Sequence, residues 1–261
     1  MARVAVDYKD HVAHVTLTRG DKMNALDPEM MEAIVAAGEE VAASKARAVV
    51  LAGEGKSFCA GLDVASFGQL ASRDPEEWLM GRSHGDANLV QQVAMVWRKV
   101  PVPVVAALQG AVYGGGLQLA LGADIRIAQP DAKLAVMEMK WGLVPDMGGM
   151  ALLPGLVRSD VLRYLTYTAR PVGAEQARDW GLVTMLAEDA LAEARALAEE
   201  IAGRSPSAIR AAKRLIGYAE GPVETAQSLM EESREQVALI GKPDQMEVVA
   251  AQMQGRKPVF D

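Results

Sequence analysis

Hydrophobic and polar residues alternate in two short segments near the N-terminus, Arg3 to Tyr8 and His11 to Thr18. Alternation with a period of two predicts a β-hairpin. After Asp27-Pro28 the apolar residues recur every three to four positions, and this dipeptide suits the N-cap and first position of a helix. A short apolar strand over 46–51 follows. Strand, helix and strand in succession predict a right-handed crossover in an α/β architecture.

The centre of the chain, residues 104–128, carries the most informative pattern. An apolar run over 104–108 is followed by three glycines at 114–116, a helical segment over 117–121 and an apolar strand over 124–128. This order predicts a strand, a glycine-rich turn, the start of a helix and a second strand. Glycines allow close backbone approach to a ligand, and the first N–H groups of a helix are free to bind an oxyanion or a carbonyl oxygen. A packing turn without a ligand is the alternative at this point.

The pattern changes again towards the C-terminus. From residue 190 onward it is helical without strand signals, and the change of composition near Ser205-Pro206 predicts a domain boundary. We therefore expect domain 1–204 and a helical region 205–261, whose basic and then apolar tail (254–261) docks on another surface that the sequence does not identify. Residues 65–85 are polar and weakly patterned, which predicts a loop or a lid.

Composition and charge exclude several classes of function. Half of the residues are hydrophobic and the net charge is −7, so a nucleic-acid-binding surface is not expected. The single cysteine, Cys59, excludes an internal disulfide and fits a reducing compartment. We find no secretory signal and no membrane-spanning run, which predicts a cytoplasmic protein without a membrane partner. The three scattered histidines do not have the spacing of metal ligands.

Two carboxylates, Glu138 and Asp146, stand in a largely apolar stretch that also contains glycine and proline. A partly buried carboxyl group near a ligand has the raised pKa that a general acid or base needs. The structural alternative is that Glu138 pairs with an arginine and Asp146 caps a helix that begins near Gly148.

Taken together, six motifs in the same order and spacing resemble those of the crotonase (enoyl-CoA hydratase/isomerase) family, over nearly the whole length of the chain. The resemblance rests on Asn24-Ala-Leu26, Lys56-Ser-Phe-Cys-Ala-Gly-Leu-Asp63, Gly110-Ala-Val-Tyr-Gly-Gly-Gly-Leu-Gln-Leu119, Asp124-Ile-Arg126, Trp141-Gly-Leu-Val-Pro145, and Glu175-Gln-Ala with Gly181-Leu-Val183.

The resemblance implies a crotonase-like spiral of ββα units followed by a C-terminal helical trimerisation region, assembled as a homotrimer or a dimer of trimers. It implies an acyl-CoA thioester as substrate, so that coenzyme A belongs to the substrate and no separate cofactor or metal is needed. The backbone N–H groups of Leu62 and Gly115 correspond to the family's oxyanion hole. The residues expected to form the substrate and coenzyme A groove are Asn24, Ala25, Ala60, Gly61, Asp63 and Gly114.

The departures from the family pattern bear on the reaction. Hydratases of the family carry a glutamate two residues after the glycine triplet, where this chain has Gln118, whereas their second glutamate corresponds to Glu138. Asp146 corresponds to an aspartate of the dienoyl-CoA isomerases. We therefore expect enolate chemistry that moves a double bond, with Glu138 and Asp146 as proton carriers and Gln118 as a polar orienting group.

Three alternatives remain open at the level of sequence. The first is hydration of an enoyl-CoA by Glu138, with Gln118 orienting the water. The second is a non-catalytic acyl-CoA-binding protein. The third is dehalogenation using His84, which is disfavoured because Glu138 occupies the position of a tryptophan in the dehalogenases of the family.

Overall fold

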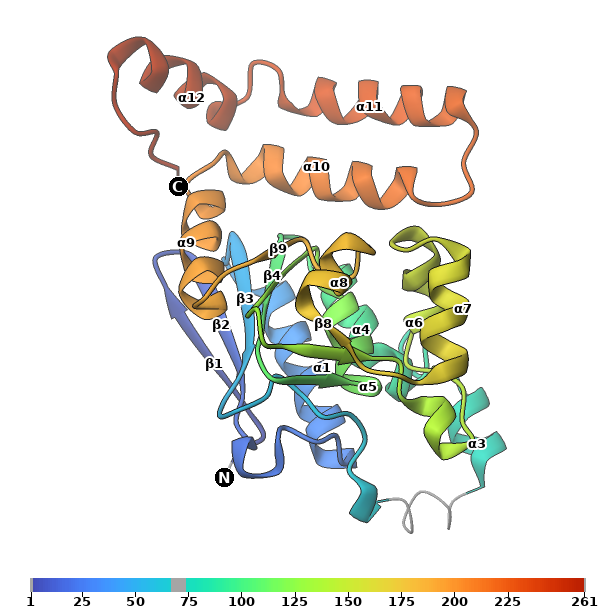
Figure 1. The fold of residues 1–261 in the computed structure, drawn as a ribbon. Helices are drawn as coiled ribbons and strands as arrows, with labels where there is room; N and C mark the ends of the chain where they lie inside the picture. The colour runs from blue at the N-terminus through green and yellow to red at the C-terminus, as the bar shows by residue number, and fades with distance from the viewer. Residues whose placement is uncertain (1, 67–73, 261) are drawn as a thin grey trace.

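Two β-sheets form the centre of the protein (Figure 1). The computed structural model describes residues 2–66 and 74–260. The larger sheet has the order β1-β2-β3-β4-β6-β9, with an antiparallel β1-β2 hairpin and parallel pairing elsewhere. In the smaller sheet, β5-β7-β8, the first pair is parallel and the second antiparallel. The strands are β1 Val4–Lys9, β2 Val12–Leu17, β3 Ala48–Gly53, β4 Val104–Leu108, β5 Ala111–Tyr113, β6 Ile125–Ala128, β7 Lys133–Ala135, β8 Val172–Gly173 and β9 Met185–Leu186.

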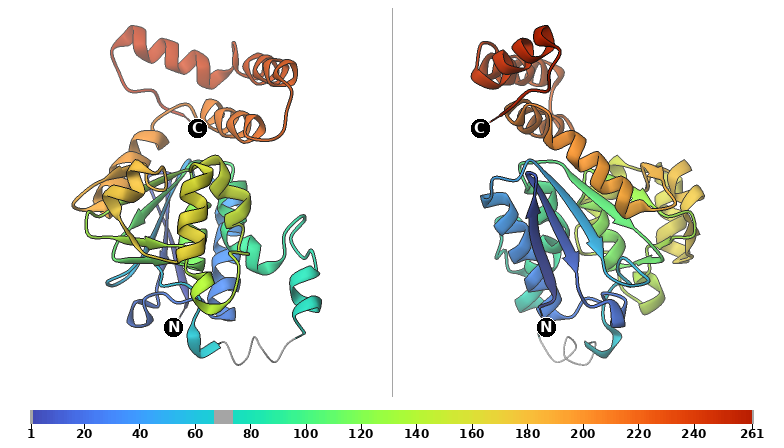
Figure 2. Two further views of the ribbon diagram at one scale, coloured as in Figure 1. Left: turned by 45° about the vertical axis from the view of Figure 1, so that its right-hand side comes forward. Right: turned by 90° about the vertical axis from the view of Figure 1, so that its left-hand side faces the viewer.

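Helices lie on both faces of the larger sheet. On one face α1 and α4 pack against each other over a core that includes Trp97 and Leu51, whereas on the other face α9 places Ala194 and Ala198 against Val105 (Figure 2, right). Small residues let α9 approach the strands closely. The α-helices are α1 Pro28–Ala43, α3 Pro75–Met80, α4 Leu89–Lys99, α5 Gly115–Leu121, α6 Gly149–Leu152, α7 Ser159–Thr168, α8 Ala174–Asp179, α9 Ala190–Ala202, α10 Pro206–Ala219, α11 Thr225–Leu239 and α12 Pro243–Gln254; the 3₁₀ helices are η1 Gly20–Lys22, η2 Val64–Ser66, η3 Glu138–Trp141 and η4 Leu153–Gly155.

The predictions for residues 3–43 are confirmed, and the strand expected over 46–51 is β3, Ala48–Gly53. The two alternating segments form the β1-β2 hairpin, and β2 pairs in parallel with β3 across α1. Asp27 caps α1, since its Oδ1 accepts a hydrogen bond of 2.8 Å from the backbone N–H of Met30. Asp-Pro is therefore a reliable start signal in this chain.

Two predictions need correction. The glycine-rich turn after β4 contains an additional strand, β5, which belongs to the second sheet; its three residues are too few to show a period. The segment expected to be a loop or lid contains helix α3, which Asp74 caps at its N-terminus ahead of Pro75. This Asp-Pro signal, the same as at 27–28, was hidden by the polar surroundings. The other part of that segment, 67–73, lies outside the described residues.

Helices α10, α11 and α12 extend away from the two sheets, as Figures 1 and 2 show. Helix α10 is tied to the core by Lys213, whose Nζ lies 2.7 Å from Oδ2 of Asp124. The tail docks as expected, because the Arg47 Nη2 donates to the Phe260 carbonyl oxygen at 2.9 Å. The α/β class with C-terminal helices is confirmed, and the boundary at 204/205 stays a prediction. Within the described ranges, no helix is long and apolar enough to span a membrane.

Candidate active site

The Gly61-Leu62 peptide presents an unused hydrogen-bond donor. The Gly61 carbonyl oxygen accepts a hydrogen bond of 2.8 Å from the backbone N–H of Leu26. All described peptide bonds are trans, so the Leu62 N–H points to the opposite side of the same peptide plane. That N–H donates no hydrogen bond to any described residue. It is therefore free to bind a ligand.

The Gly114-Gly115 peptide has the same property. The Gly114 carbonyl oxygen accepts from the backbone N–H of Gln118 at 3.0 Å within the first turn of α5, and the Gly115 N–H points the other way. Among the described residues the Gly115 N–H also has no acceptor. The Met147 side chain packs directly over this backbone, since a Cβ on Gly115 would lie 2.5 Å from the Met147 Sδ.

The two peptides lie next to each other. Gly61 has φ +90°, and a Cβ at that position would lie 2.6 Å from the Tyr113 carbonyl oxygen and 3.5 Å from the Gly115 backbone nitrogen. Only glycine tolerates both this backbone conformation and this close approach. Two unpartnered N–H groups side by side are the arrangement that stabilises an oxygen on which negative charge develops.

Glu138 stands beside this pair of amides at the start of η3. Its Oε1 accepts a hydrogen bond of 2.6 Å from Gln118 Nε2 and lies 3.3 Å from the point where a Cβ of Gly114 would be. Its Oε2 is buried and has no hydrogen-bond partner among the described residues. Burial raises the pKa of Glu138; the Asp146 charge adds to this effect, while the Gln118 hydrogen bond and the nearby amides of Met137 and Glu138 oppose it. A carboxylate with one unpaired oxygen and a raised pKa is suited to accept a proton.

Gln118 connects Glu138 to the segment that carries Asp146. Its side chain is 1% exposed, and its Oε1 accepts hydrogen bonds from the backbone N–H groups of Met147 at 2.8 Å and Gly149 at 2.9 Å. Both lone pairs of the amide oxygen are therefore used. Gln118 thus fixes one oxygen of Glu138 and the turn just after Asp146.

Asp146 lies in the turn that leads to α6. Although the residue is exposed, partial burial of its carboxyl group raises its pKa, and its own backbone amide opposes the shift. The structural alternatives for both carboxylates are wrong: α6 has Gly148 as its N-cap without a side-chain capping bond, and Glu138 pairs with no arginine of the described residues. Among residues 2–66 and 74–260, neither carboxylate has a cation to neutralise it.

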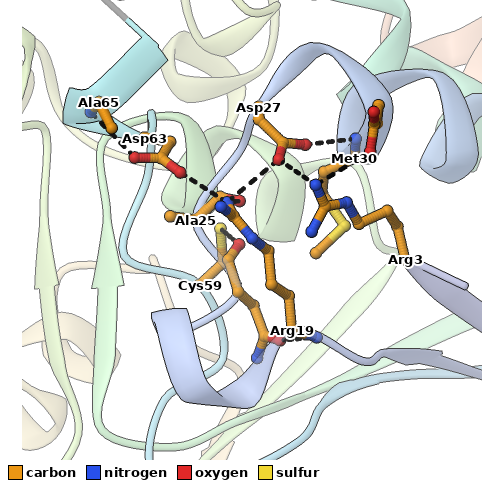
Figure 3. A network of polar contacts seen from close by, with 10 residues as sticks. Arg3, Arg19, Ala25, Asp27, Met30, Cys59, Asp63 and Ala65 are labelled. Atoms are coloured by element: carbon orange, nitrogen blue, oxygen red, sulfur yellow. Dashed lines mark hydrogen bonds and ion pairs between the residues drawn. The ribbon is translucent and has the colours of Figure 1, made fainter. Parts of the chain in front are cut away.

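Asp63, which directly follows Leu62 in the chain, is neutralised. Arg19 Nη1 lies 2.7 Å from Asp63 Oδ2 and 3.4 Å from Asp27 Oδ2, and Arg3 bridges Asp27 and Glu29 (Figure 3). Burial alone would raise the pKa of Asp63, but the bond to Arg19 and the Ala65 N–H outweigh it and lower the pKa. We call Arg3, Arg19, Asp27, Glu29 and Asp63 the arginine network.

Of the other residues expected to form the groove, Ala60 directly precedes the Gly61-Leu62 peptide, whereas Asn24 and Ala25 lie in the connection between η1 and α1. The Asn24 side chain is fully buried and its Nδ2 lies 2.9–3.0 Å from the carbonyl oxygens of Glu54, Ser57 and Phe58, so it ties its own turn to the segment 54–58. Ala25 and Ala60 are half-buried neighbours of these bonds. The roles assigned to the site residues stay predictions.

His84 lies in the turn between α3 and α4, where its Nδ1 is 2.9 Å from Ser83 Oγ. Arg19 and Met147, in contrast, belong to the site and were not found from the sequence. The sequence contained a signal for Arg19. This residue follows a buried strand, and the two turns that it joins contain Asp27 and Asp63 as possible ion-pair partners. Within the described residues, no group of three or more His, Cys, Asp or Glu could hold a metal ion.

Comparisons with known proteins agree with this geometry. A profile of the enoyl-CoA hydratase/isomerase family matches residues 7–261. The chain is 34% identical over 214 residues to an (E)-benzylidenesuccinyl-CoA hydratase of Thauera aromatica, covering 80% of each chain. It is 33% identical over 219 residues to the mitochondrial Delta(3,5)-Delta(2,4)-dienoyl-CoA isomerase of Mus musculus, covering 78% of this chain and 64% of the relative.

Among solved structures, an enoyl-CoA hydratase from Bacillus anthracis superimposes with a TM-score of 0.86 at 30% identity, covering 99% of this chain and 98% of that one. The resemblance expected from the motifs is thus confirmed in sequence and in fold. The chain belongs to the enoyl-CoA hydratase/isomerase (crotonase) family of enzymes.

Proposed function

We propose that the protein is an isomerase that moves a double bond in an enoyl- or dienoyl-CoA thioester. The observation that carries this proposal is the buried, unpartnered Oε2 of Glu138 beside the two free amides. A non-catalytic binder has no need of an unpaired carboxylate oxygen, since leaving a polar atom without a partner costs free energy.

In the proposed reaction the thioester carbonyl oxygen accepts hydrogen bonds from the Leu62 and Gly115 N–H groups. Glu138 removes a proton from the carbon chain, and the electron pair of the broken C–H bond moves into the thioester to form an enolate that these amides stabilise. Asp146, whose raised pKa helps it to retain a proton, delivers one at a second carbon, which shifts the double bond. Exchange of both carboxyl groups with solvent restores the starting state.

Gln118 favours isomerisation over hydration. Both lone pairs of its amide oxygen are used by Met147 and Gly149, so this oxygen cannot accept a hydrogen bond from a water molecule. Of Gln118 and Glu138, only Glu138 could then accept a proton from a nucleophilic water. Hydration is the second candidate because one relative at 34% identity is named a hydratase.

A product assay in deuterated water tests the proposal. Purified protein is incubated with 2-enoyl-, 3-enoyl- and 3,5-dienoyl-CoA, and products are identified by NMR and mass spectrometry. We expect a shifted double bond with incorporated deuterium and no added oxygen. A 3-hydroxyacyl-CoA as the main product would make the enzyme a hydratase, and binding without turnover would make it an acyl-CoA carrier.

The variant Gln118→Glu sharpens this distinction. A carboxylate at 118 still accepts from the Met147 and Gly149 N–H groups, while its second oxygen replaces the Nε2 that lies 2.6 Å from Glu138 Oε1. The two carboxyl groups then share one proton, and the pair can exchange protons with a water molecule. We expect this variant to gain hydratase activity relative to isomerase activity. Equal product ratios in the variant and the wild type would show that the residue does not select between the two reactions.

The proposed enzyme is a homotrimer or a dimer of trimers. Helix α11 supports this because Leu229, Met230 and Val237 are exposed apolar side chains on an element that extends from the core. Light scattering is expected to give three or six times the chain mass of 27.8 kDa. A mass equal to one chain would contradict the assembly.

A further inference from the structure

Arg19 contacts both segments that hold the Leu62 peptide. Its Nη1 donates to the Ala25 carbonyl oxygen at 2.9 Å and lies 2.7 Å from the Asp63 carboxylate (Figure 3). Ala25 and Asp63 are the immediate neighbours of Leu26 and Leu62. Leu26 and Leu62 form an isolated parallel bridge, in which the Leu26 N–H donates to Gly61 and the Leu26 carbonyl oxygen accepts from Asp63.

A bridge of one residue on each side fixes the orientation of a peptide weakly, because no neighbouring ladder continues it. The guanidinium group supplies the missing support by joining the residue before Leu26 to the residue after Leu62. The Asp63 side chain is held at its other oxygen as well, since Oδ1 accepts from the Ala65 N–H at 3.0 Å. The bridged peptide is therefore held from both ends.

The cluster is shielded from solvent. The exposed fractions of the Arg19, Asp27 and Asp63 side chains are 15%, 11% and 16%. Interactions between partly buried charges are screened less by salt than surface pairs. Because the carbonyl of Ala25 and the carboxylates of Asp27 and Asp63 surround Arg19, its guanidinium group is directed at the protein itself.

We propose that Arg19 is a positioning residue that sets the direction of the Leu62 N–H, and thereby the strength with which this amide polarises the thioester carbonyl. The inference rests on the proposed function for the identity of the ligand. It assigns Asp63 to holding the amide in place through Arg19 instead of contacting coenzyme A.

The main test compares Arg19→Lys with Arg3→Lys. Lysine keeps the charge but lacks the planar fork that binds a carbonyl and a carboxylate together. Arg3 is the matched control, because it belongs to the same arginine network through Asp27 at 2.6 Å and Glu29 at 2.9 Å but makes no hydrogen bond or ion pair with residues 61–63. We expect kcat of Arg19→Lys to fall roughly 10- to 100-fold with little change in the Kd of the thioester, and Arg3→Lys to stay close to wild type.

A spectroscopic readout separates positioning from a general loss of structure. A cinnamoyl-CoA that carries an electron-donating ring substituent absorbs at longer wavelength when its carbonyl group is polarised. We expect this shift in wild type and in Arg3→Lys, and a smaller shift in Arg19→Lys at saturating thioester. An equal shift in all three proteins would overturn the inference.

A substrate without phosphates excludes a direct contact between Arg19 and coenzyme A. If Arg19 acts on the Leu62 amide, the substitution lowers kcat by the same factor for the acyl-CoA and for the matching acyl-pantetheine thioester. A loss confined to the acyl-CoA, seen as a higher KM, would instead assign Arg19 to the phosphates and overturn the inference.

Hydrogen exchange tests the inference without any reaction. In the free protein, the amides of Leu26 and Asp63, which form the bridge, are expected to exchange faster in Arg19→Lys than in wild type and Arg3→Lys. If no thioester is turned over, the proposed function fails while this readout still decides the role of Arg19. Unchanged exchange of both amides would contradict it.

Discussion

Carboxylates adjoin the same two free amides in two different settings. Next to Leu62, Asp63 belongs to the arginine network, and Arg19 lowers its pKa. Next to Gly114, Glu138 has an amide donor on one oxygen and no described partner on the other, and burial raises its pKa. In our proposals, the first group holds a backbone donor in place and the second exchanges a proton with the substrate.

If these roles are correct, the charged partners of a carboxylate decide whether it has a structural or a chemical role. A neutralised carboxylate gains stability in its charged form and resists protonation. A buried carboxylate without a cation lowers the stability of the folded protein and is more basic, as is common at active sites. Substitutions that remove charge should therefore have opposite consequences in the two settings.

The largest expected effect is on activity. Glu138→Gln keeps an oxygen that can accept from Gln118 Nε2 but cannot take a proton, so kcat should fall by roughly 100- to 10,000-fold. Asp63→Asn removes the ion pair with Arg19 and should cost less, because the proton-transfer groups remain. Steady-state kinetics on the best substrate of the panel measures both. Equal losses of kcat in the two variants would contradict the assignment of different roles to Glu138 and Asp63.

A comparable loss of activity is expected from a substitution at Gly61, whose backbone lies next to the Leu62 amide. In Gly61→Ala the new Cβ would lie 2.6 Å from the Tyr113 carbonyl oxygen, which must move the Leu62 amide. We expect kcat to fall by roughly 100- to 1,000-fold, the typical cost of losing one donor.

Gly241→Ala is the matched control for this substitution. Gly241 also has a positive φ, +72°, but a Cβ there meets nothing within 4 Å. It therefore carries the backbone strain without the collision. Normal activity in both variants would contradict the role of the Leu62 amide.

The pH dependence of the reaction follows from the raised pKa of Glu138. As a base it must be ionised, so kcat/KM should decline as the pH falls through a pKa above the ordinary glutamate value. Asp63→Asn should leave this decline of kcat/KM at low pH unchanged, because Asp63 does not exchange a proton with the substrate. A decline of kcat/KM centred at or below the ordinary glutamate pKa would show that Glu138 is fully solvated in the working enzyme.

The smallest expected effect is on stability, and its sign differs between the settings. The lowered pKa of Asp63 stabilises the fold above the ordinary aspartate pKa, and this contribution is lost as the pH falls through the lowered value. Asp63→Asn should thus reduce the free energy of unfolding by roughly 1–3 kcal/mol at neutral pH.

The raised pKa of Glu138 has the opposite effect on the free energy of unfolding. The folded state is stabilised relative to the unfolded state while Glu138 is protonated, and this stabilisation is lost as the pH rises through the raised pKa. Glu138→Gln should therefore be neutral or stabilising by up to about 1 kcal/mol at neutral pH, with no gain in acid. Denaturant unfolding at two pH values checks both signs. Destabilisation by both variants at neutral pH would contradict the account.

Periodicity and capping signals predicted much of the fold. The β1-β2 hairpin, α1 and the crossover to β3 follow from patterns longer than five residues. The strands β5 and β8 have three and two residues, and pairing between distant segments, not local pattern, defines them. Helix α3 was missed because six residues are too few to show a helical period, although Asp74-Pro75 marks its start.

For the site, motif spacing predicted the two turns and Glu138, Asp146 and Gln118. It could not predict that Gln118 uses both lone pairs of its oxygen on Met147 and Gly149, because these bonds join segments about thirty residues apart. The arginine network was missed for the same reason: the partner of a charged side chain is set by tertiary structure.

The central claim, that Glu138 and Asp146 carry separate protons, is tested most directly by deuterium exchange into a single enoyl-CoA. Wild type, Glu138→Gln and Asp146→Asn are followed by NMR at each carbon of the acyl chain in deuterated water. The account predicts that Asp146→Asn still exchanges the proton that Glu138 removes but forms little isomer, whereas Glu138→Gln does neither. Exchange that persists without Glu138, or normal isomer formation without Asp146, would contradict it.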